Sequence, residues 1–165
     1  MSSPAQTYKL NERSALKAIL LATLIAGTLD ILAAIVSYTI KGGKEPVKIF
    51  YFIASGVFGK DMAYGSGSGM AVAGLLFHYM IALLFAIFLF FVYPSLKSFL
   101  KNKIVIGLLY GIFVWLVMNK IVLPLSNSPA LPFNVKGAVI GALILMFCIG
   151  LPLALIIDKF YSKWR

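Results

Sequence analysis

The sequence predicts an all-α fold, a four-span transmembrane helix bundle with up-down topology, which forms a single integral membrane domain over residues 1–165. Of these residues 61% are hydrophobic and only 12% are charged, whereas soluble domains average about 25% charged residues. Four apolar stretches are each long enough to cross a hydrocarbon core, which takes about 20 residues of helix. The lysines and arginines lie almost entirely between or beside these stretches. Because no separate basic domain remains, the net charge of +10 indicates topology signals and lipid contacts, and no nucleic-acid binding is expected.

The first predicted span covers residues 15–40 and carries one carboxylate, Asp30, well inside it. An ionisable side chain at that depth is costly, so it needs a partner or a task. Small residues recur at every fourth position on the same face, a spacing that suits close helix contact. They are Ala18, Ala22, Ala26 and Ala34. We therefore expect Asp30 to face protein rather than lipid.

The connection after this span, residues 41–69, begins and ends with segments that break helices. Between them, Pro46 suits the first position of a helix and Gly59 suits a C-terminal cap, which predicts a short helix over residues 46–58. Such a helix is too short to span the bilayer. We expect it to lie at the membrane interface or to enter as a re-entrant segment, acting either as a packing lid over the bundle or as a pore element.

The second predicted span, residues 70–93, ends before Pro94 and contains the single histidine of the chain, His78. His78 shares a helix face with Gly74 and Ala82, so we expect it to point inward. A short basic turn follows, which makes the second and third spans antiparallel neighbours.

The third predicted span, residues 103–123, carries a G-x-x-x-G motif at Gly107 and Gly111 and has Asn119 near its far end. The motif lets two helices approach closely, and packing within the chain is favoured over dimerisation. A connector with three prolines, at positions 124, 129 and 132, leads to the last span. Its proline content predicts a semi-rigid segment.

The fourth predicted span, residues 137–157, carries a second helix-packing motif at Gly137 and Gly141. Pro152 is expected to kink this span and to free the carbonyl of Cys148. The closing segment, residues 158–165 with the sequence DKFYSKWR, is predicted to be an aromatic and basic interfacial anchor.

The distribution of positive charge predicts that both termini lie in the cytoplasm. Nine of the 15 lysines and arginines lie on the side of the termini, in residues 1–17, 94–103 and 158–165. Six lie on the other side, in residues 41–69 and 120–136. The excess favours the cytoplasm for the first group, with anionic head groups at that face as partners.

Three polar side chains are predicted to gather inside the bundle. At 1.5 Å per helical residue, Asp30 and His78 lie about 15 Å and about 12 Å from the outer boundary, so they share one depth. Asn119 lies at roughly 6 Å from that boundary and extends the set toward the loop side. A buried contact between Asp30 and His78 would stabilise the charged form of each partner. Such a contact serves either proton or cation binding or the register of the helices. The alternative is that each residue forms hydrogen bonds to serine, threonine or backbone groups, which would also fix the register.

Other classes of site find little support in the sequence. One histidine, one intramembrane aspartate and one distant cysteine do not make a ligand set, so neither a metal nor a cofactor is expected. Haem bound by two histidines would need two subunits. No elbow motif presents Ser37, Ser66 or Ser68 as a nucleophile, and no phosphate-binding loop is present.

Four segments of the chain resemble small bacterial inner-membrane proteins of the YagU-like type. They are GTLDIL in the first span, FIASGVFG in the first loop, GLLFHYMIALLFAI in the second span and MNKIVLPLSNSPALPFN before the fourth. The resemblance covers residues 27–155 as a pattern of spans. It implies a four-span inner-membrane protein and no biochemical activity, and the YagU-like proteins have longer loops.

From the sequence we expect an accessory or structural membrane protein in which Asp30 and His78 form an internal polar contact. The first alternative is a small proton- or ion-coupled transporter or channel subunit, which would be a homo-oligomer because four spans enclose little cavity. The second alternative is a membrane-embedded enzyme that acts on a lipid or a quinone, which depends only on Asp30 and His78.

Overall fold

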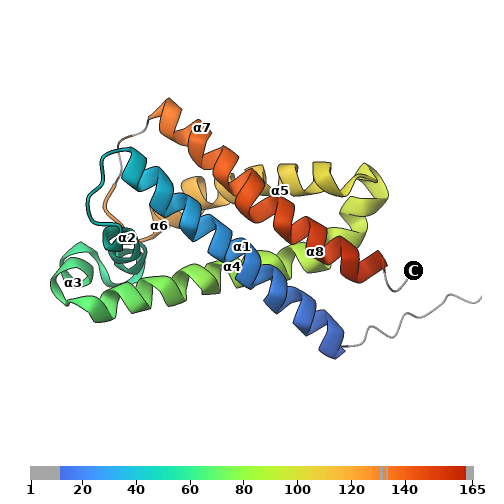
Figure 1. Ribbon diagram of the computed structural model, residues 1–165, viewed down its shortest axis with the longest axis horizontal. Helices are drawn as coiled ribbons and strands as arrows, with labels where there is room; N and C mark the ends of the chain where they lie inside the picture. The colour runs from blue at the N-terminus through green and yellow to red at the C-terminus, as the bar shows by residue number, and fades with distance from the viewer. Residues whose placement is uncertain (1–11, 131, 133, 163–165) are drawn as a thin grey trace, which may run out of the picture.

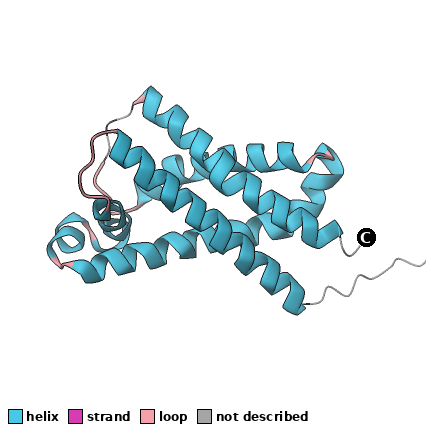
Figure 2. Cartoon of the chain, viewed as in Figure 1, coloured by secondary structure: helices cyan, strands magenta, loops and turns pink. Residues whose placement is uncertain are grey.

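The computed structural model describes residues 12–130, 132 and 134–162, and this part of the chain is helical throughout apart from its short connections (Figure 2). Four of its helices are long and apolar enough to cross a membrane, which confirms the predicted fold class. The spanning segments are α1 (Glu12–Ile40), α4 (Ser68–Leu100), α5 (Lys103–Val117) with η1 (Met118–Val122) and α6 (Leu123–Leu125), and α7 (Val135–Ile144) with η2 (Leu145–Gly150) and α8 (Leu151–Ser162).

The four spans run up and down between two ends of the bundle. In Figure 1, α1 and the helix formed by α7, η2 and α8 lie side by side and cross α4 and α5 obliquely. We call the end where α1 and α5 begin and α4 and α8 end the basal end, and the opposite end the distal end. The turn from α4 to α5 is closed by Asn102, whose side-chain oxygen accepts a hydrogen bond from the Ile104 amide at 2.9 Å.

The outer surface of the spans is strongly apolar, and the contacts between them combine small residues with a core of large apolar side chains such as Leu89, Ile106 and Leu153. Ala22 and Ala26 of the predicted small-residue stripe are completely buried between helices. Other large apolar side chains point outward, with Leu76 65% exposed and Phe91 72% exposed. Exposed apolar surface of this extent suits lipid rather than water. The chain is therefore a multi-pass membrane protein.

The second span does not end at Pro94, as the sequence predicted, but continues to Leu100 with the proline inside it. Proline lacks the amide hydrogen that would bond to the carbonyl four residues earlier, which is that of Phe90. In the structure the Tyr161 hydroxyl, on α8, donates a hydrogen bond to the Phe90 carbonyl at 2.9 Å. A neighbouring helix thus supplies the missing donor, and α4 continues without an unpaired carbonyl.

Replacing Tyr161 by phenylalanine should therefore destabilise the bundle by about 1 to 3 kcal/mol, the cost of a buried carbonyl without a donor. The same substitution in a Pro94→Ala background should cost close to nothing, because alanine restores the amide donor to Phe90. Denaturation of the four proteins in detergent measures both values. Equal losses in the two backgrounds would show that the Tyr161 hydroxyl does not replace the missing amide.

Two short helices cover the distal end. α2 (Val47–Phe58) begins after Pro46 and ends at Gly59, as predicted, and α3 (Lys60–Gly65) follows where no helix was expected. Figure 1 shows α2 almost end-on, so it lies crosswise to the spans. It packs on α4 at Gly74, where a Cβ atom would overlap the backbone of Phe50. The proline-rich loop holds the last turn of α2, where the backbone amide of Asn127 donates a hydrogen bond to the Gly56 carbonyl at 3.0 Å. α2 thus packs on α4 and on the loop after α6.

Each of two spans contains a π-helical turn shortly before a proline. η1 ends at Val122, two residues before Pro124, and η2 ends at Gly150, two residues before Pro152. Pro152 lies in the first turn of α8, directly after the π-helical turn, and the span continues through it to Ser162. Single π-helical turns of this kind are found often at functional sites.

The glycines of the third span bring two backbones into contact. A Cβ atom on Gly107 would lie 2.8 Å from the Leu151 Cα, and one on Gly111 would lie 2.7 Å from the Leu145 carbonyl oxygen. Gly150, which the sequence analysis did not select, faces both of them from η2. The predicted close packing is therefore found within the chain.

The second glycine motif does not make a contact of this kind. A Cβ atom on Gly141 would meet only the Trp115 side chain within 4 Å, and one on Gly137 would meet only the side chain of Asn134, which caps α7. Gly137 lies in the first turn of α7, beyond the point where the two spans approach each other, whereas Gly141 leaves room for the Trp115 ring of α5.

Candidate functional site

The predicted contact between Asp30 and His78 is not present in the structure. His78 Nε2 lies 2.8 Å from the carbonyl oxygen of Gly27, one helical turn before Asp30. Gly27 has no side chain, and a Cβ atom there would lie 3.0 Å from the ring of Tyr79. Because α4 approaches α1 so closely at this glycine, the imidazole reaches the backbone carbonyl instead of the carboxylate.

The bond to Gly27 determines which nitrogen of His78 carries a proton. A carbonyl oxygen can only accept, so Nε2 must donate. In the neutral imidazole Nδ1 is then the acceptor nitrogen. His78 is half-buried and links α4 to α1, so its immediate role is to hold these two spans together.

Asp30 is half-buried between three spans. His78 on α4 and Cys148 on η2 lie within electrostatic range of its carboxyl group. Within the described residues, Asp30 forms no ion pair and accepts no side-chain or backbone hydrogen bond. The structure thus places a carboxyl group beside a π-helical turn in the middle of the bundle without a bonded partner.

Asn119 does not extend this site. It lies on η1 with an exposed side chain, and its Nδ2 donates a hydrogen bond to the Trp115 carbonyl of its own helix at 2.9 Å. Cys148 is a free, half-buried thiol. Among the residues that the structure describes, no group of three or more histidine, cysteine, aspartate or glutamate side chains is close enough together to hold a metal ion.

The strongest polar cluster lies at the basal end and centres on Asp158. One oxygen of its carboxylate accepts hydrogen bonds from the Tyr93 hydroxyl and the Lys97 ammonium, each at 2.8 Å. The other oxygen lies 3.4 Å from Lys103 Nζ. Asp158 is only 6% exposed, whereas Lys103 reaches toward solvent or head groups with 48% of its side chain exposed. We call these four residues the basal cluster.

The basal cluster connects three spans, because Tyr93 and Lys97 lie on α4, Lys103 on α5 and Asp158 on α8. Aromatic side chains surround it, and the rings of Tyr93 and Tyr161 are stacked with centroids 5.8 Å apart. A carboxylate shielded in this way forms stronger ion pairs than one in water, and loses more when a partner is removed. Its chemistry is that of an internal ion pair with all donors supplied by the chain.

Sequence reasoning missed this cluster because it assigned residues 158–165 to a surface anchor. Residues 163–165 lie outside the described part of the chain, while Asp158 faces inward and Phe160 is 7% exposed. A usable signal was present. Asp158 is the one acidic residue at the end of the fourth span, on the same side of the membrane as the basic turn with Lys97 and Lys103.

No family model, curated protein or solved structure matches the chain.

Proposed function

We propose that this protein is a structural or accessory component of a bacterial inner membrane, with no catalytic activity of its own. The basal cluster is the observation that carries the proposal, because its one buried carboxylate is bonded to three side chains of neighbouring spans. Charged groups used in this way hold helices together and are not available to a substrate. The enzyme alternative depended only on Asp30 and His78, and the His78 imidazole is bonded to the Gly27 carbonyl.

We place the basal end in the cytoplasm. Lys97, Lys101 and Lys103 surround the turn from α4 to α5. The side of the membrane with the basal end has nine positive residues, and the other side has six. This bias favours the cytoplasm for the basal end and anionic head groups as its partners. Membership of the YagU-like group, which rests on the pattern of spans, stays a prediction.

Asp30 favours a second candidate function, that of a proton- or cation-coupled transporter or channel subunit. A carboxyl group inside a membrane that has no bonded partner among the described residues is a functional-site hypothesis by default. The π-helical turn η2 packs against α1, and its Cys148 lies within electrostatic range of the Asp30 carboxyl group. Under this hypothesis, Asp30 would bind the coupling ion alone, and His78 would position α1 against α4.

Ion flux into vesicles separates the two functions. The purified chain in proteoliposomes with a pH or cation gradient is expected to give the same flux as empty vesicles, and Asp30→Asn should not change it. His78→Gln serves as a control for a change in helix packing near the same depth. Flux above background that Asp30→Asn abolishes would overturn the structural proposal and support the transporter.

A further inference from the structure

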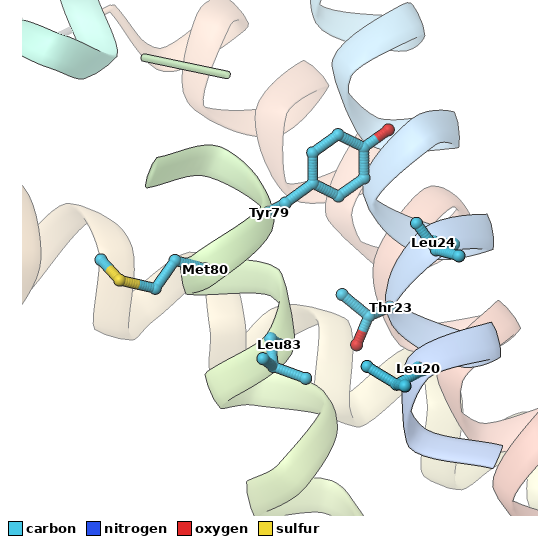
Figure 3. A pocket seen from close by; sticks show the side chains of 6 residues that line it. All are labelled: Leu20, Thr23, Leu24, Tyr79, Met80 and Leu83. Atoms are coloured by element: carbon cyan, nitrogen blue, oxygen red, sulfur yellow. The ribbon is translucent and has the colours of Figure 1, made fainter. Parts of the chain in front are cut away.

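A hollow of about 340 Å³ lies between α1 and α4, on the outer side of the two spans. This volume is at the lower end of those of small-molecule sites, about 300 to 1,000 Å³. Figure 3 shows Tyr79 and Leu83 of α4 facing the side chains of α1 across it, whereas the Met80 side chain extends away from α1. Its lining consists of Leu20, Thr23, Leu24, Tyr79, Met80 and Leu83.

The two polar side chains of the lining are already bonded within the chain. The Thr23 hydroxyl donates to the Ile19 carbonyl at 2.9 Å, and the Tyr79 hydroxyl is hydrogen-bonded to that of Thr28 at 2.8 Å. The hollow therefore offers its occupant an apolar wall and no unpaired polar group. A ligand suited to it is a hydrocarbon chain.

The position of the hollow also favours a lipid chain. Leu20 and Leu24 are 44% and 58% exposed and Met80 is 50% exposed, so the hollow opens sideways at the depth of the hydrocarbon core. Tyr79, bonded to Thr28, lies at its distal end, beyond Leu24 (Figure 3). Toward the basal end the hollow has no such barrier among its lining residues.

Positive charge lies in line with the hollow at that basal end. Arg13 and Lys17 are exposed, and the spacing of positions 13, 17, 20 and 24 places them on the same face of α1 as Leu20 and Leu24. Arg13 lies about 10 Å along the helix from Leu20, at 1.5 Å per residue. With Glu12 included, these first turns carry one excess positive charge. The charge complements an anionic head group.

We propose that the hollow binds one acyl chain of an anionic phospholipid whose phosphate is held by Arg13 and Lys17. The chain runs from these residues along Leu20 and Leu24 and ends against Tyr79. The site goes beyond the proposed structural function and depends only on the chain being embedded in a bilayer. It is independent of the role of Asp30.

Native mass spectrometry of the full chain tests the site. The protein is equilibrated in nanodiscs of phosphatidylglycerol and phosphatidylcholine with identical acyl chains, in equal amounts, and then released in mild detergent. Wild type should retain one phospholipid, with phosphatidylglycerol preferred. Leu24→Trp, which fills the hollow, should reduce retention severalfold, and Leu83→Trp repeats the test from α4. Leu21→Trp is the matched control, since Leu21 is 51% exposed on α1 but does not line the hollow.

A second pair of variants tests the head-group contact. Lys17→Gln should lower retention of phosphatidylglycerol more than that of phosphatidylcholine, whose choline group offsets the phosphate charge, and so reduce the preference for phosphatidylglycerol about fivefold, the effect of one basic residue near an anionic surface. Lys41→Gln, at the other end of α1, should change neither. Equal retention by Leu24→Trp and Leu21→Trp would mean annular lipid only and overturn the proposal. The proposal would also be overturned if Leu24→Trp abolished a dimer of the chain and left lipid retention unchanged. The hollow would then be an interface between copies.

Discussion

Leucine in place of Gly111 is expected to separate α5 from η2 and to cost at least about 3 kcal/mol, the upper range for overpacking a rigid core. A side chain at this position would overlap the backbone of Met146, and its Cβ atom would lie 2.7 Å from the Leu145 carbonyl oxygen. Backbone atoms in helices cannot move aside as a flexible side chain can. Thermal unfolding in detergent, followed by loss of helical signal, measures the effect.

Gly137→Leu is the matched control for this prediction, because it changes the same residue type in the same kind of sequence motif. A Cβ atom there would meet only the Asn134 side chain, at 3.8 Å. Leucine should also favour the helix by about 1 kcal/mol relative to glycine. If Gly137→Leu is as damaging as Gly111→Leu, close packing between α5 and η2 is not what makes Gly111 necessary.

Asp158→Leu is expected to cost about 3 kcal/mol, because it leaves the partly buried ammonium of Lys97 without its counter-ion. The Tyr93 hydroxyl, on a side chain that is 1% exposed, loses the same acceptor. The cost comes from the groups left behind rather than from the ion pair itself. Equilibrium denaturation by SDS from a mild detergent measures it.

Removing both charges should recover part of this loss. Asp158→Leu combined with Lys97→Met leaves no unpaired charge between α4 and α8, and apolar replacement of a buried ion pair is often neutral. The double variant should therefore be more stable than Asp158→Leu alone. A double variant whose loss equals the sum of the two single losses would show that Lys97 and Asp158 do not interact.

Hydropathy and breaker residues were sufficient to predict the four spans, because each span must satisfy its backbone internally and is set by its own length. The prediction that the second span ends before Pro94 was wrong, and the reason lies elsewhere in the chain. Pro94 stays inside α4 because the hydroxyl of Tyr161, 71 residues away from Phe90, bonds to the exposed carbonyl. Local rules for proline cannot include a donor from another helix.

The site was harder to predict than the spans, since it depends on how helices rotate against one another. Depth along the helix placed Asp30 and His78 near one level, and His78 does reach α1 within a turn of Asp30. Their mutual orientation was decided by Gly27, where the backbone itself is accessible to the imidazole. Asp158 and Lys97 are 61 residues apart, and only packing of α8 against α4 brings them together.

Which carboxylate holds the bundle together is tested most directly by replacing Asp158 and Asp30 in turn by leucine and measuring the free energy of unfolding. Asp158→Leu is expected to lower the free energy of unfolding by about 3 kcal/mol. Asp30→Leu should leave it unchanged or raise it, since a half-buried carboxyl group without a bonded partner is unfavourable inside a membrane and leucine removes that cost. A loss at Asp30→Leu as large as that at Asp158→Leu would contradict the assignment of the structural role to the basal cluster.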